Sequence, residues 1–302
     1  MMTQMTRREL ALSLSLSLFG ASFLLAAATT PVARAGDLEQ IAALESVARA
    51  AYAERNFDQA ILALTEMIKL APSEPRYLEM RADASVDKKA FVEGIRDYRA
   101  AIALLGDDTI DKARVLSQVG LALEGLDRWD EAIESYNQSL ELANALGNDR
   151  DPYLLNSLGN CYASVGDWSK ARTFYTESAN SFQRSRAVDI SMQKRLDGAI
   201  FSFSNAVLMD AQIGDLDEAA IVKRMQDLAR RAPGSADMRA ALAAMYWSAG
   251  EQEKAEASWE FACNNIAVGC AKYEDFDWLR RVRRWPPVMV KRMEAFVKLD
   301  RE

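Results

Sequence analysis

Histidine is absent from the 302-residue sequence, and cysteine occurs only three times. The absence of histidine excludes histidine metal ligands, Ser-His-Asp and Cys-His catalytic arrangements, and the commonest general base near neutral pH. The sequence also lacks a Gly-rich phosphate loop with a lysine, a Gly-x-Ser-x-Gly motif and a Cys-x-x-Cys pair. We therefore predict a protein that is not an enzyme and that has no catalytic site, metal site or cofactor.

Proline and glycine are also scarce, with 7 and 14 copies, whereas half of the residues are hydrophobic. Few helix-breaking residues in a chain rich in alanine and leucine favour an all-α protein. The length alone would suggest about two domains. Internal repetition changes that expectation, because repeated units pack mainly on their neighbours.

Residues 158–175 show the repeated unit most clearly. They predict a helix, a sharp turn at Gly166 and Asp167, and a second helix. Gly159 on the first helix and Ala171 on the second carry almost no side chain, so the two helices can approach closely there. The stretch therefore predicts a helical hairpin with one apolar seam.

The same pattern recurs six times along residues 36–269. An opening residue of each second helix is followed three residues later by alanine or glycine and, in all but the fifth unit, seven residues later by a bulky side chain. The opening residues are Phe57, Phe91, Trp129, Trp168, Leu216 and Gln252, and the small residues are Ala60, Gly94, Ala132, Ala171, Ala219 and Ala255. Residues 186–199 lengthen the fifth unit, and we expect them to be helical.

These motifs resemble the tetratricopeptide repeat, a two-helix unit of about 34 residues. The resemblance implies a right-handed superhelix, an α-solenoid of about six hairpins with a C-terminal capping helix. The expected units are residues 41–74, 75–108, 113–146, 152–185, 200–233 and 236–269.

The resemblance further implies that the first helices line a concave groove that holds a protein or peptide partner. Asn156 and Asn160 lie one helical turn apart and could together hydrogen-bond a peptide backbone. The alternative is an ordinary solvated inner face. The full set of groove candidates is Arg49, Tyr52, Arg76, Asp83, Arg114, Tyr153, Asn156 and Asn160.

Residues 1–35 have the features of an export signal. The pair Arg7-Arg8 precedes an uncharged apolar run over residues 10–28, and Ala33-Arg34-Ala35 before Gly36 has the form of a cleavage site between Ala35 and Gly36. The arginine pair resembles a twin-arginine signal, with the Sec route as the alternative. An uncleaved membrane anchor is the alternative interpretation, because 19 apolar residues can just span a bilayer.

Residues 270–302 break the repeat and are basic. They carry a net charge of +3 and residues 1–35 a net +2, so the chain total of −7 leaves −12 for residues 36–269. Such an acidic array repels nucleic acid. For the basic tail we expect a cap over the open end of the last hairpin, or a docking patch for an acidic protein or an anionic membrane. The patch candidates are Arg280, Arg281, Arg283, Arg284 and Trp285.

The block Trp278-Leu279-x-x-Val282-Arg283-Arg284-Trp285-Pro286-Pro287 resembles the C-terminal signature of repeat proteins from plastids and cyanobacteria. This resemblance implies a scaffold that assists the assembly or maintenance of a photosynthetic complex, located in the thylakoid lumen of a chloroplast or cyanobacterium. A periplasmic adaptor of a bacterial envelope complex and a membrane-anchored structural subunit are the alternatives.

The remaining motif is a cysteine pair. Cys263 and Cys270 could form a disulfide in an exported protein if a turn separates them, but not if seven helical residues do. Cys161 has the position of a core residue in the fourth hairpin.

Overall fold

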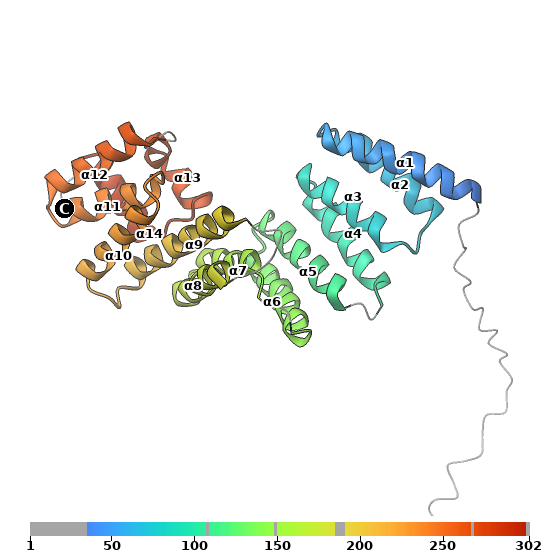
Figure 1. Ribbon diagram of the computed structural model, residues 1–302, viewed down its shortest axis with the longest axis horizontal. Helices are drawn as coiled ribbons and strands as arrows, with labels where there is room; N and C mark the ends of the chain where they lie inside the picture. Colours follow the sequence, from blue (N-terminus) through green and yellow to red (C-terminus); the bar gives the residue numbers. More distant parts are fainter. Residues whose placement is uncertain (1–34, 107–108, 148–149, 185–190, 267–268, 300–302) are drawn as a thin grey trace, which may run out of the picture.

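The computed structural model describes residues 35–106, 109–147, 150–184, 191–266 and 269–299. These residues form six helical hairpins followed by three short helices (Figure 1). The predicted signal lies outside them, except that Ala35 begins the first helix. None of the helices described here is long and apolar enough to cross a bilayer.

The hairpins follow the predicted order along the chain. Hairpin 1 is α1 (Ala35–Ala53) and α2 (Phe57–Leu70), hairpin 2 is α3 (Pro75–Asp87) and α4 (Phe91–Leu104), and hairpin 3 is α5 (Thr109–Glu124) and α6 (Trp129–Ala145). Hairpin 4 is α7 (Pro152–Ser164) and α8 (Trp168–Arg184), hairpin 5 is α9 (Met192–Ile213) and α10 (Glu218–Arg231), and hairpin 6 is α11 (Asp237–Ser248) and α12 (Gln252–Asn265). Each second helix packs against the first helix of the next hairpin, which makes an α-solenoid.

Small residues at the predicted positions let the paired helices approach. Ala60, Ala132, Ala171 and Ala255 are completely buried. In hairpin 4, a Cβ atom added to Gly159 would lie 2.5 Å from the ring of Tyr175, because the tyrosine packs directly onto the glycine backbone. The close helix contact predicted from residues 158–175 is therefore present.

Hairpin 5 departs from the predicted register by two residues. Its second helix begins at Glu218 rather than at Leu216, because the side chain of Asp217 caps the helix by accepting a hydrogen bond from the Ala220 amide. Ile221 is consequently the buried residue, whereas Ala219 is exposed. The prediction that Ala219 takes the small-residue position was wrong.

The turn inside every hairpin contains one residue in the left-handed conformation. Gly166, Gly214 and Gly250 occupy it in hairpins 4 to 6, and Arg55, Lys89 and Asp127 occupy it in hairpins 1 to 3 with φ of 60°, 71° and 56°. Residues with a Cβ atom are strained in this conformation and glycine is not. Six equivalent turns therefore use two different residue classes.

We expect Arg55→Gly to raise the free energy of unfolding by about 0.5–1 kcal/mol. Glycine relieves the backbone strain of the folded state, and this gain exceeds the loss that comes from the greater conformational entropy of the unfolded chain. Gly166→Ala is the matched opposite change and should lower the free energy by about 1 kcal/mol. Urea unfolding followed by circular dichroism measures both. A loss of stability in Arg55→Gly would contradict the expectation.

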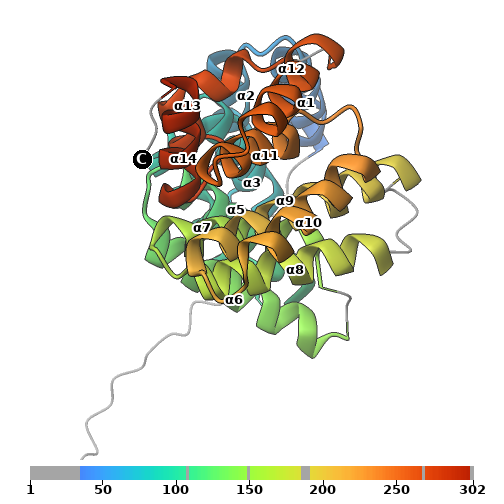
Figure 2. The ribbon, with the colours of Figure 1, turned by 90° about the vertical axis from the view of Figure 1, so that its left-hand side faces the viewer.

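The C-terminal tail folds back onto the array. The short 3-10 helix η1 (Ala271–Glu274), α13 (Phe276–Arg281) and α14 (Pro287–Val297) follow hairpin 6. Helix α14 packs mainly against α11 and also against α9, which are the first helices of hairpins 6 and 5 (Figures 1 and 2). The capping helix is thus present, but it covers these first helices rather than the open end of the last hairpin.

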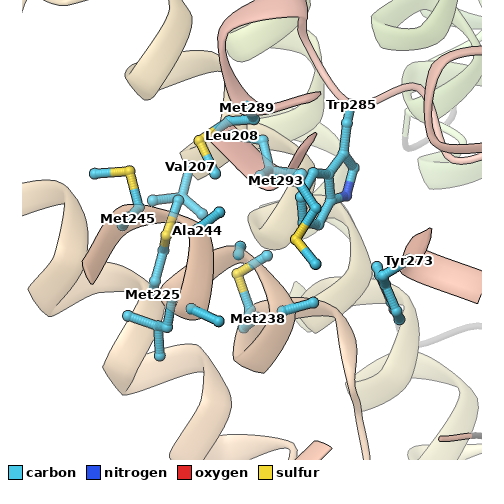
Figure 3. Close-up of a cluster of buried hydrophobic side chains, with 14 of the residues drawn as sticks. Val207, Leu208, Met225, Met238, Ala244, Met245, Tyr273, Trp285, Met289 and Met293 are labelled. Atoms are coloured by element: carbon cyan, nitrogen blue, oxygen red, sulfur yellow. The ribbon is translucent and has the colours of Figure 1, made fainter. Parts of the chain in front are cut away.

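Apolar side chains of α14 hold the tail in place. Met289 and Met293 are completely buried and lie among Leu208 of α9 and Ala244 of α11 (Figure 3). Alanine on α11 leaves room for α14 to approach, and flexible methionine side chains fill the remaining space. Because these apolar side chains are removed from water, the tail is an integral part of the fold.

Candidate functional site

Polar contacts join the first helices of hairpins 1 to 3 along one surface. Arg76 on α3 pairs with Glu45 on α1 at 3.3 Å, and Arg114 on α5 pairs with Glu79 on α3 at 2.6 Å. We call the surface formed by α1, α3, α5 and α7 the first-helix surface. All eight predicted groove residues lie on these four helices, and ion pairs and a hydrogen bond link the candidates on α1, α3 and α5.

The groove candidates on α1 and α3 are partly engaged with their neighbours. Arg49 pairs with Glu45 on its own helix, but its side chain is 65% exposed. The hydroxyl group of Tyr52 donates a hydrogen bond to Asp87, and burial together with this bond raises the pKa of Tyr52 to about 12. Burial also raises the pKa of Asp83, which accepts a hydrogen bond from Tyr98.

On α7 the candidates combine an exposed ring with two amides. Tyr153 is 53% exposed, and its ring packs edge-on against Phe182. The side-chain oxygen of Asn160 accepts a hydrogen bond of 2.9 Å from the hydroxyl group of Tyr175. The side-chain oxygen of Asn156 similarly accepts one from Ser202. These bonds use the amide oxygens, so the –NH₂ groups can donate to the carbonyl groups of a bound peptide.

The tail packs over α11 and the C-terminal half of α9, whereas Phe201 in the N-terminal half of α9 is 47% exposed. Leu208, Ala240 and Ala244 occupy positions equivalent to the groove residues, and all three are completely buried beneath the tail. The prediction of a groove that runs through all six hairpins was therefore wrong. The tail fills its C-terminal third, and the accessible part lies on hairpins 1 to 4.

Arg283, one residue of the predicted docking patch, attaches the tail to α11 and α9. Arg283 is buried, and its guanidinium group donates a 2.8 Å hydrogen bond through Nε and a second bond through Nη2 to the carboxylate of Asp237. It also donates to Asn205 and lies over the ring of Phe201. The carboxylate of Asp237 accepts a further bond of 3.2 Å from Trp285.

Two of the five docking-patch residues are consequently not available to a partner. Arg283 and Trp285 are buried, because Asp237 and the apolar cluster around α14 hold them inside. Arg284 pairs with Glu124 of α5 at 3.3 Å and stacks over Trp129. Of the five patch candidates, Arg280 and Arg281 are the two whose side chains are largely exposed. Sequence reasoning missed Asp237, whose position at the start of the sixth unit was its only signal.

A hollow of about 1060 Å³ lies where the tail meets the turns of hairpins 3 and 4. We call it the edge hollow. Trp129, Trp168 and Ala163 line it from the array, and Arg280, Arg281 and Val282 line it from the tail. Its size is at the upper end of the range for ligand pockets, about 300–1000 Å³.

The cysteine pair lies at the base of the tail. Cys263 and Cys270 are joined by a disulfide, which is possible because α12 ends at Asn265, before Cys270. Cys161 is a buried free thiol whose pKa is raised by burial. Among the described residues no group of cysteine and acidic side chains is arranged to hold a metal ion.

Comparison with known families identifies the repeats. Residues 48–109 and residues 111–184 match two family models of the tetratricopeptide repeat. Hairpins 1 to 4 therefore contain tetratricopeptide repeats, as the sequence resemblance implied. No curated protein matches the chain at a significant level.

Solved structures share the fold over most of the chain. The apo form of RapI covers 86% of this chain and 96% of its own, with 12% identity and a TM-score of 0.60. PilF of Pseudomonas aeruginosa covers 80% and 98%, with 14% identity and a TM-score of 0.55. The MamA protein covers 65% and 93%, with 18% identity and a TM-score of 0.51. At these identities the likeness concerns the fold alone.

Proposed function

We propose that this protein is a non-enzymatic scaffold that binds a segment of a partner protein on the first-helix surface of hairpins 1 to 4. The observation that carries the proposal is the difference between the two ends of the array. The tail packs over α11 and the C-terminal half of α9, whereas Tyr153 and Leu121 on α7 and α5 remain 53% and 49% exposed. Exposed apolar side chains among polar ones are typical of a surface that accepts a peptide.

The chemistry of this surface favours an extended segment. Asn156 and Asn160 can donate hydrogen bonds to its backbone, and Tyr153 offers a ring beside them. Two ion pairs lie on this surface, Glu45 with Arg76 and Glu79 with Arg114. Because each pair is neutral overall, it fixes the register of a bound partner and adds little net attraction.

We further propose that the protein is exported and acts in the thylakoid lumen, where it assists assembly or maintenance of a photosynthetic complex. The support is the charged start and apolar run over residues 1–35 and the resemblance of residues 278–287. A periplasmic adaptor and a membrane-anchored subunit are the competing proposals. N-terminal sequencing of the purified protein separates cleavage from anchoring: a start at Gly36 supports cleavage, and an intact Arg7-Arg8 supports the anchor.

The groove is tested by capture of partners from native membranes with Asn156→Ala combined with Asn160→Ala. We expect about tenfold weaker capture, because each lost hydrogen bond removes about 0.5–1.5 kcal/mol. Quantitative mass spectrometry of the captured proteins measures the change.

Glu134→Ala combined with Gln138→Ala is the matched control. These two residues are also four apart and hydrogen-bonded to each other, but they lie on the second helix α6. Capture should be unchanged in this variant. Equal capture by the wild type and the asparagine variant would place the partner elsewhere.

A further inference from the structure

The edge hollow presents guanidinium groups with loose ion pairs. Arg280 lies 3.6 Å from Glu294, and Arg281 lies 3.7 Å from Asp277, with side chains 54% and 74% exposed. Charge-assisted hydrogen bonds are shorter, about 2.7–2.9 Å. Both guanidinium groups can therefore offer N–H donors to a carboxylate that enters the hollow.

Apolar surface lies next to these charges. Trp129 and Trp168, which open equivalent helices in successive hairpins, contribute partly buried indole rings to the wall. Val282 of the tail also lines the hollow and is 67% exposed. A large apolar side chain of a partner that enters the hollow would remove these surfaces from water. Residues that contribute most to binding in protein interfaces fill pockets in this way.

The wider charge distribution makes this site unusual in the molecule. Residues 36–269 carry a net charge of −12, whereas residues 270–302 carry +3. The hollow has more basic than acidic side chains in its lining, in contrast to the acidic array. The basic ones are Lys89, Arg280, Arg281, Arg284 and Lys291, and the acidic ones are Glu124, Asp127, Asp277 and Glu294. The array as a whole repels an acidic ligand, whereas the exposed guanidinium groups of Arg280 and Arg281 attract one.

We propose that the edge hollow binds an acidic segment of a partner protein, with carboxylates on Arg280 and Arg281 and an apolar side chain between Trp129 and Trp168. The proposal rests on the proposed scaffold function and gives the scaffold a second contact surface, which selects partners by charge. A protein segment fits better than an anionic membrane, because the indole rings line a recess that a flat bilayer does not enter.

The test uses the full chain as purified and a fluorescein-labelled octapeptide of aspartate and glutamate with one central phenylalanine. Fluorescence anisotropy should show binding that weakens at least tenfold in Arg280→Glu combined with Arg281→Glu. It should also weaken as the salt concentration rises, because the contacts are exposed to screening. The same peptide with lysine at the acidic positions should not bind.

Two controls make the result specific. Arg230→Glu reverses a similarly exposed arginine on α10 and should leave peptide binding unchanged. Asn156→Ala combined with Asn160→Ala should also leave it unchanged, so failure of the groove and failure of the edge hollow give different results. The arginine pair replaced by glutamine should bind with intermediate affinity.

Three results overturn the proposal. One is absence of peptide binding by the folded wild type, checked by circular dichroism. Another is equal binding by the double glutamate variant. The third is sedimentation of the wild type with vesicles containing anionic lipid, lost in the double glutamate variant, without any binding of the acidic peptide, which would assign the arginines to a membrane.

Discussion

Replacing Asp237 with alanine is expected to lower the free energy of unfolding by about 3–5 kcal/mol, the usual loss when one partner of a buried ion pair is removed. The carboxylate of Asp237 accepts hydrogen bonds from Arg283, Tyr273 and Trp285. In the variant the guanidinium group of Arg283, whose side chain is only 8% exposed, would stay buried with Asn205 as its remaining hydrogen-bond partner. Guanidinium chloride unfolding measures the loss.

The matched control is Asp277→Ala. Asp277 also pairs with an arginine, but both side chains are more than 70% exposed, so its loss should stay within about 0.5 kcal/mol. Asp237→Leu combined with Arg283→Met should restore part of the stability, because no unpaired charge then remains inside. A loss below about 1 kcal/mol in Asp237→Ala would show that water reaches Arg283 and that the tail is loosely held.

The second large effect is expected in hairpin 4. Tyr175→Ala should destabilise the protein by about 3–5 kcal/mol, as truncation of large buried aromatic side chains does. Tyr175 is 1% exposed and packs on the backbone of Gly159, which has no side chain to fill the space left behind. The change also removes the hydrogen bond to Asn160.

Tyr153→Ala makes the same chemical change at a site that is 53% exposed, and we expect it to cost less than about 1 kcal/mol. Thermal and urea unfolding of the two variants in parallel give the comparison. Similar losses in both would mean that hairpin 4 does not pack around the contact of Gly159 with Tyr175.

The repeats could be predicted because their signals are local. Phe57, Phe91, Trp129, Trp168 and Gln252 each begin a second helix in the structure, as the pattern indicated. The exception is informative. At hairpin 5 the spacing pattern favoured Leu216, which Asp215 would cap. In the structure Asp215 instead pairs with Arg172, and Asp217 caps the helix by accepting a hydrogen bond from the Ala220 amide.

The site was less predictable than the fold. The candidates on α1, α3, α5 and α7 follow from repeat positions, and their role in binding stays a prediction. The four arginines between residues 280 and 284 are alike in sequence, yet Arg283 is enclosed while Arg281 is 74% exposed. Asp237, which makes this difference, is 46 residues away from Arg283.

The amino-acid sequence by itself determined the two-helix units, their order and the places where they turn, because caps, small residues and apolar spacing act over a few residues. Only the tertiary structure decided where the tail goes and how much of the first-helix surface stays open. The spacing of Met289, Met293 and Phe296 shows that α14 buries one face, but not which face of the array receives it. That choice depends on shape and charge between residues distant in the chain, with alanines on α11 leaving space and Asp237 binding Arg283.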